Sequence, residues 1–224
     1  MKSTGKTYVT QKSFRITKYL LNKIKNPSRA ALHLLKSAAL CVIMIVTRMQ
    51  EARMKTAKVS VVPYDASWTD EFLKIKGEIE DAIGDLIIGI EHVGSTAVEG
   101  MYAKPCIDID VIIRDRSALT EVIEKLNTVG YVHEGDLGIK DREAFAYEDK
   151  PHLYKHHLYV CPIDSVELYR HVTFRNFLRA TPAAAQEYSR IKKEAAALYP
   201  DSIDKYIEHK SPTVKKLYAL CGLE

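Results

Sequence analysis

Residues 106–113 have the sequence CIDIDVII, and this alternation is the clearest strand signal in the chain. Successive side chains of a strand point to opposite faces, so Asp108 and Asp110 are predicted to share one face and the apolar residues between them the other. Their α-carbons should then lie about 6.5 to 7 Å apart. Two carboxylates at this spacing can hold a hard divalent cation such as Mg²⁺, and without a cation their repulsion would be unfavourable.

A Gly-Ser turn precedes this strand. Residues 86–93 are apolar and rich in isoleucine, which predicts a strand, and Gly94, Ser95 and Thr96 follow it directly. Such a turn can present backbone N–H groups and a hydroxyl to a phosphate. Lys104, in the loop before the aspartates, can pair with a phosphate or remain solvated. A turn for phosphates and two carboxylates for a metal are the parts that metal-assisted phosphoryl or nucleotidyl transfer needs.

The remaining pattern mixes strands with helices and then becomes helical. Ser67 to Asp70 has the spacing of a capping box, and Ser117 is predicted to cap a second helix that ends at Gly130. Helices are predicted at 67–83, 117–130, 166–179, 182–199 and 203–220, the last restarting at Ser211-Pro212, and further strands at 131–133, 144–147 and 156–160. This order predicts an α+β fold, with a mixed β-sheet, flanking helices and a C-terminal helical subdomain.

Charge is distributed unevenly along the chain. Of 33 Lys and Arg and 29 Asp and Glu, residues 1–50 hold ten basic residues and no acid, so the other 174 residues hold 23 basic and 29 acidic ones. The formal net charge of +4 is therefore +10 on the N-terminal segment and −6 on the rest. This distribution gives no support to a uniformly basic nucleic-acid-binding surface.

Residues 1–58 are predicted to be a poorly ordered extension or to lie outside the fold, and residues 59–224 to form the domain. The unbroken apolar run, residues 38–46, is too short for a transmembrane span, which needs about 20 residues. The segment also lacks the layout of a secretory signal, although its composition leaves an organellar presequence as an alternative. Four cysteines without metal-binding or disulfide spacing favour a reducing, cytoplasmic location.

Several motifs share their order and spacing with one known family. They are Pro63-Tyr64-Asp65 with Trp68, residues 92–98, Ala103-Lys104-Pro105, residues 107–110, residues 156–160, residues 174–179, Tyr188, and Tyr206 with Lys210-Ser211. Together they resemble the GrpB family within the polymerase-β-like nucleotidyltransferase superfamily, from about Val61 to the C-terminus. The resemblance implies a nucleotidyltransferase-like fold. It implies no particular reaction, although some relatives are fused to a dephospho-CoA kinase domain.

The chain departs from the superfamily at a third carboxylate, which active members place on a neighbouring strand. The corresponding residues 156–160 have the sequence HHLYV and contain no acid. The acids that could approach from loops are Asp141, Glu143, Asp149 and Asp164. Alternatively, His157 could serve as a ligand or a phosphate contact.

Other side chains have two interpretations each. His156 and His157 alternate across a strand, so at most one of them should face the cleft. Arg175 and Arg179 share a helix face, which suits either a phosphate or salt bridges to acidic residues. His92, before the Gly-Ser turn, is predicted to be structural.

The leading hypothesis is an enzyme that uses Mg²⁺ or Mn²⁺ to transfer a nucleotidyl group from a nucleoside triphosphate to a small acceptor. Asp108 and Asp110 are its predicted catalytic residues and metal ligands. Its predicted substrate-binding residues are Gly94, Ser95, Thr96, Lys104, His157 and Arg175. The alternative is a non-catalytic module that binds a nucleotide or a CoA-like ligand and keeps the fold without the third carboxylate. A metal-dependent glycosyltransferase is a weaker third hypothesis, because the Gly-Ser turn comes before the aspartates.

Overall fold

The computed structural model describes residues 58–223. The predicted N-terminal extension therefore lies outside the described residues except for Lys58, and its role stays a prediction. So does the assignment of residues 59–224 to one domain.

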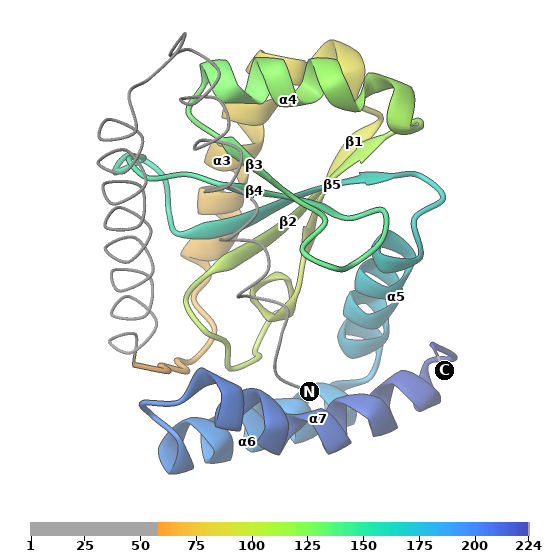
Figure 1. Cartoon of the computed structure of the whole chain (residues 1–224). Helices are drawn as coiled ribbons and strands as arrows, with labels where there is room; N and C mark the ends of the chain where they lie inside the picture. The colour runs from red at the N-terminus through yellow and green to blue at the C-terminus, as the bar shows by residue number, and fades with distance from the viewer. Residues whose placement is uncertain (1–57, 224) are drawn as a thin grey trace, which may run out of the picture. The chain divides into compact units, whose positions relative to one another are not determined.

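The centre of the fold is a mixed sheet of five strands in the order β1-β2-β5-β4-β3. The strands are β1 Gly89–Val93, β2 Ile107–Ile113, β3 Val132–Gly135, β4 Glu143–Ala146 and β5 His156–Pro162. β2 pairs in parallel with β5, and the other neighbours pair antiparallel. The α+β prediction is confirmed, and the strand with the two aspartates lies between β1 and β5 (Figure 1).

Two helices cover one face of the sheet. These are α3, Ser67–Ile83, and α4, Leu119–Thr128. α3 buries isoleucines at 75, 79 and 83 completely, because a spacing of four residues keeps them on one helical face. They pack with Val122 and Leu126 of α4 against the apolar face of β2, where Ile107, Ile109 and Val111 are also fully buried. The apolar half of the CIDIDVII alternation therefore forms the core, which leaves the aspartates on the opposite face.

Three helices complete the described chain. α5 is Val166–Ala180, α6 is Pro182–Leu198 and α7 is Ile203–Leu220. α5 runs along the face of the sheet that carries the aspartates, and α6 and α7 lie together beyond one end of the sheet (Figure 1). Val98 and Met101, which follow the Gly-Ser turn, share a second apolar cluster with side chains of all three helices. This cluster fixes the C-terminal helices next to the turn.

The two predicted serine caps are wrong for the same reason. The backbone N–H of Ser67 donates to the Asp65 carboxylate over 2.9 Å, and that of Ser117 donates to Asp115 over 2.8 Å. In both places an aspartate two residues earlier is the acceptor, and charge-assisted hydrogen bonds of this kind are stronger than those to a hydroxyl.

Two other boundaries also differ from the prediction. α7 does not restart at Pro212 but continues through it, with the Ser211 hydroxyl donating to the Ile207 carbonyl over 2.6 Å. The strand predicted from residue 86 begins at Gly89, because Gly84–Leu86 forms a 3-10 turn after α3.

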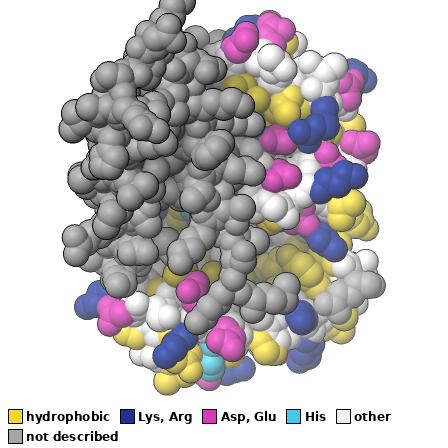
Figure 2. Space-filling model, viewed as in Figure 1, with side chains coloured by type: hydrophobic (Ala, Val, Ile, Leu, Met, Phe, Trp, Pro, Cys, Tyr) yellow, Lys and Arg dark blue, Asp and Glu magenta, His cyan; other side chains and the backbone are white. Residues whose placement is uncertain are grey.

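The described surface carries no marked segregation of charge on the face in Figure 2. There, acidic and basic side chains alternate over the coloured part of the molecule. Among the helices of residues 58–223, none combines the length and apolar character that crossing a bilayer requires.

Candidate functional site

The strand register places the two aspartates side by side in different environments. Asp108 lies opposite Val93 in β1 and His157 in β5, whereas Asp110 lies opposite Glu91 and Tyr159. The Asp108 side chain is 35% exposed, but that of Asp110 is completely buried under α5. The prediction that both share a face is therefore confirmed, and only Asp108 is directly accessible.

The Gly-Ser turn closes tightly against Asp108. Gly94 has φ 71° and ψ −168°, a backbone conformation that favours glycine. A β-carbon at this position would collide with the Asp108 carboxylate, whose Cγ would be 3.1 Å away. Two contacts fix the residues that follow: His92 Nε2 lies 3.0 Å from the Thr96 hydroxyl, and Arg179 donates to the Ala97 carbonyl over 2.7 Å. Arg179 thus positions the turn instead of forming a salt bridge, and His92 has the predicted structural contact.

Asp108 is also held by a histidine from the neighbouring strand. His157 Nδ1 lies 2.8 Å from Asp108 Oδ1, and this hydrogen bond raises the pKa of His157 to about 10. His156 points to the other face, where its Nδ1–H donates to the Tyr154 carbonyl and its Nε2 accepts from the Tyr131 hydroxyl. Burial there lowers the pKa of His156 to about 4. One histidine of the pair therefore faces the site, as predicted.

Asp110 contacts a histidine that the sequence did not indicate. His171 of α5 places Nδ1 2.7 Å from Asp110 Oδ2, and its Nε2 lies 3.9 Å from Glu167. Burial raises the pKa of Asp110. Burial also disfavours the protonated form of His171, but the hydrogen bond to Asp110 favours it, and the pKa of His171 is raised. The other oxygen, Asp110 Oδ1, is buried and has no hydrogen-bond partner. An unpaired buried carboxylate oxygen is costly, so this atom is suited to bind a cation.

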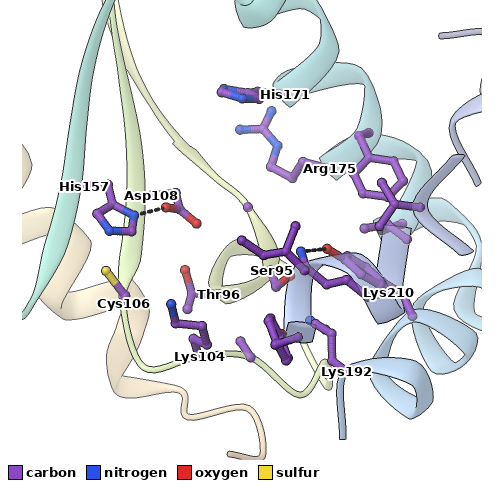
Figure 3. Close-up of a pocket in the computed structure, with 18 of the residues that line it drawn as sticks. Ser95, Thr96, Lys104, Cys106, Asp108, His157, His171, Arg175, Lys192 and Lys210 are labelled. Atoms are coloured by element: carbon purple, nitrogen blue, oxygen red, sulfur yellow. Dashed lines mark hydrogen bonds and ion pairs between the residues drawn. The ribbon is translucent and has the colours of Figure 1, made fainter. Parts of the chain in front are cut away.

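A cavity of about 350 Å³ opens in front of these groups. That size is within the usual range for small-molecule sites. Figure 3 shows Asp108, Thr96 and Lys104 on the side of the strands, and Lys192 and Lys210 on the side of the helices. The predicted residues that line it are Gly94, Ser95, Thr96, Lys104, Asp108, His157 and Arg175. Asp110 lies beneath the lining, under His171.

Comparison with known proteins agrees with the motifs. A family model described as GrpB protein matches residues 58–220. The chain belongs to the GrpB family. UPF0157 protein YqkA of Bacillus subtilis is 35% identical over 158 residues, which cover 70% of this chain but only 46% of YqkA. Glutamate-rich protein GrpB of Alkalihalophilus pseudofirmus is 32% identical over 163 residues, which cover 71% of this chain and 94% of that protein.

A solved structure supports the same assignment. The crystal structure of conserved protein GrpB from Enterococcus faecalis resembles this chain with a TM-score of 0.65 and 31% sequence identity. The match covers 72% of this chain and 96% of that one. The described GrpB fold is therefore shared with an experimentally determined relative.

None of the four acids considered as a third carboxylate lines the cavity of this GrpB-family chain. Glu143 lies opposite Val160, on the other face of the sheet, and binds Arg116 and His133. Asp141 also binds Arg116, while Asp149 and Asp164 are exposed and absent from the lining.

The position on β5 opposite Asp110 is Tyr159, and the guanidinium of Arg142 lies 4.4 Å from the centre of its ring. The β5 position opposite Asp110 therefore holds an aromatic ring, covered by a guanidinium, in place of a third carboxylate.

The residues present nevertheless fit one divalent cation. Residues 58–223 contain no cluster of three or more His, Cys, Asp or Glu arranged as a metal site. Mg²⁺, however, is usually held by one or two carboxylates together with substrate phosphates and water. Asp108, beside the Gly-Ser turn, and the unpaired Oδ1 of Asp110 would supply those two carboxylates.

Arg175 links the site to the sheet. Its guanidinium lies 2.5 Å from Glu91 Oε2 and donates to the His92 carbonyl over 2.8 Å, and the residue is 8% exposed. It lines the cavity while forming a salt bridge, so both interpretations of this residue agree with its position.

Two lysines of the cavity were not predicted as site residues, although Lys210 belongs to one of the motifs that resemble the family. Lys192 of α6 is 3% exposed, its ammonium has no hydrogen-bond partner, and it lies 4.4 Å from the Tyr188 ring centre. Burial lowers the pKa of Lys192 to about 7. Lys210 of α7 donates to the Tyr188 hydroxyl over 3.3 Å. The sequence did contain an indication that Lys192 is buried. It follows Tyr188 by four residues and precedes Ala195 by three, so it lies on the apolar face of the helix.

Proposed function

We propose that this GrpB-family protein is a Mg²⁺-dependent nucleotidyltransferase, which moves a nucleotidyl group from a nucleoside triphosphate to a small acceptor. The observation that supports the proposal is the close packing of the Gly94 turn against Asp108, which brings a turn suited to binding phosphates next to a pair of carboxylates. The family assignment by itself supplies no reaction. Mn²⁺ would suit the same oxygen ligands.

The predicted site residues have these roles under this proposal. Ser95 binds the phosphates through its hydroxyl and Lys104 through its ammonium, while Thr96, whose hydroxyl contacts His92 Nε2, completes the turn that faces them. Asp108 and Asp110 hold the cation. When bound there, Mg²⁺ would neutralise charge that develops on the α-phosphate of the transferred nucleotidyl group. Arg175 keeps β1 and α5 together through Glu91 and adds positive charge to the cavity.

One observation favours a second candidate, a module that binds a nucleotide or a CoA-like ligand without turnover. His157 and Tyr159 occupy the positions on β5 opposite the aspartates, so no carboxylate there can accept a proton from an acceptor hydroxyl. Both candidates use the same cavity. They differ in whether a labelled product forms.

The first test concerns the carboxylates. We expect Asp108→Asn combined with Asp110→Asn to abolish Mg²⁺-dependent ATP binding in calorimetry while the circular dichroism spectrum is retained. The matched control is Asp149→Asn with Asp164→Asn, which removes two exposed charges outside the cavity. Equal affinity of wild type and the first variant for ATP·Mg²⁺ would show that the site is assigned wrongly.

The second test separates the two candidates. The wild-type protein is incubated with α-labelled ATP, Mg²⁺ and a cell extract depleted of macromolecules. Labelled small molecules that form with wild type but not with the double asparagine variant support transfer. ATP binding without any labelled product supports the binding module.

A further inference from the structure

The helix wall of the cavity carries two lysines that have no acidic partner in the described chain. Lys192 comes from α6 and Lys210 from α7, and both contact the ring or hydroxyl of Tyr188. No salt bridge to either lysine is present within residues 58–223. A buried ammonium without a partner is unfavourable. An anionic ligand in the cavity would offset this cost.

These lysines are additional to the groups that the nucleotide needs. On the strand wall, the turn at Gly94, the side chain of Lys104 and the aspartates already provide for phosphates and a cation. Among the described residues, Asp108 is the only acid that lines the cavity, against four Lys and Arg side chains and two histidines. The two lysines lie on the helix side, across from Asp108 and Thr96 (Figure 3). Their position therefore suits a second anion beside the nucleotide.

Among the described residues, Asp108 is the only acid that lines the cavity, and Glu91, which lies opposite Asp110 in β1, is held by Arg175. This arrangement limits which acceptors can react. A hydroxyl must lose its proton as it attacks phosphorus, and a positioned base usually takes that proton. The β5 positions opposite the aspartates hold His157, whose Nδ1 is already bonded to Asp108, and Tyr159, which Arg142 covers. A phosphate monoester needs no such base, because its second pKa is about 6 and its oxygens are ionised at neutral pH.

We propose that the acceptor is a phosphate monoester, whose phosphate group binds between Lys192 and Lys210. This inference rests on the proposed nucleotidyl transfer. An ionised oxygen of the acceptor phosphate forms a new bond to the α-phosphorus of the nucleotide. The bond from that phosphorus to the oxygen bridging to the β-phosphate breaks, and pyrophosphate leaves with the electron pair. The product contains a new pyrophosphate bridge between nucleotide and acceptor, and no proton has to be removed.

Methyl phosphate, the smallest monoester, is a direct probe of this subsite. The full chain is first saturated with Mg²⁺ and α,β-methylene-ATP, which cannot transfer its nucleotidyl group, and methyl phosphate is then titrated by NMR. We expect methyl phosphate to bind this complex. We also expect Lys192→Met and Lys210→Met each to weaken its binding at least about tenfold, which is about 1.4 kcal/mol. The exposed neighbour Lys193→Met is the matched control and should bind normally.

Two results would overturn the proposed phosphate subsite, and a third would separate it from the proposed function. Failure of methyl phosphate to bind the wild-type nucleotide complex would overturn the inference. So would a loss of nucleotide affinity itself in both lysine variants, because the lysines would then hold the triphosphate. If wild type binds no nucleotide, the proposed function fails separately, while methyl phosphate binding that depends on both lysines would still support the anion subsite.

Discussion

Replacing Lys192 by methionine should stabilise the protein while it weakens anion binding. Burial lowers the pKa of Lys192 from its usual value of 10.5 to about 7. At about 1.36 kcal/mol per unit, retaining this amine in the folded chain costs at most about 5 kcal/mol at pH 7 or below. Methionine has a similar length and no charge, so it removes this cost. Relaxation of the structure around the lysine reduces this cost below its upper limit, so we expect the free energy of unfolding to rise by about 2–4 kcal/mol in the variant.

The sign of the pH dependence follows from the same pKa difference. Between pH 7 and 10.5 the unfolded chain holds a proton on Lys192 that the folded chain has released, so the lysine's contribution makes wild type more stable as pH rises. The advantage of Lys192→Met should therefore be largest below pH 7 and shrink by about 1.4 kcal/mol per pH unit above it.

Urea unfolding at pH 7 and pH 9.5 measures both effects. At pH 7 the melting temperature should also rise by about 5–15 °C for a domain of this size. Lys193→Met changes an exposed lysine of the same helix and should leave stability nearly unchanged at either pH. A Lys192→Met variant that is less stable than wild type at pH 7, or a stability difference independent of pH, would refute the reasoning.

Two further predictions concern the turn and the buried histidines. Gly94→Ala adds a β-carbon that collides with Asp108 and also has the cost of a positive φ, about 1–2 kcal/mol. In the control Gly100→Ala, at φ 77°, the new β-carbon has no atom within 4 Å, so only the backbone cost remains. Calorimetry should show a loss of ATP·Mg²⁺ affinity in the first variant only, and equal losses would contradict the role of the turn. Burial lowers the pKa values of His92 and His156 to about 4, so the unfolded chain binds more protons than the folded one between pH 6.5 and 4. Stability should fall as pH decreases through this window, by up to about 1.4 kcal/mol per unit for each histidine, and an NMR titration midpoint near 6.5 for either would contradict the burial argument.

The local part of the site was predictable from the sequence. The alternation in residues 106–113 identified the strand and the shared face of its aspartates, because one face must be apolar to pack on α3 and α4. Gly94 was predicted as part of a sharp turn at a strand end, which is also a local pattern. Its close approach to Asp108, 14 residues later, is visible only in the structure.

The rest of the site depends on contacts between distant segments. Asp110 and His171 are 61 residues apart, and no local pattern states which side chain of α5 will lie above a particular strand residue. The periodicity of α6 does place Lys192 on the buried face, but it cannot distinguish a face against the core from one against a cavity. Pro212 shows the same limit, since packing of α7 against α6 outweighs the usual preference for a break at proline.

The two walls of the cavity come from segments of the chain that are synthesised at different times. The strand wall comes mainly from residues 94–108, with His157 of β5, and the helix wall includes Lys210 of α7, about a hundred residues after Asp108. Chains are synthesised from the N-terminus at about 5–20 residues per second. The carboxylate pair thus leaves the ribosome several seconds before the lysines that face it. A nascent chain interrupted before α7 would lack Lys210 and Tyr218, so the cavity is complete only after α7 has been synthesised.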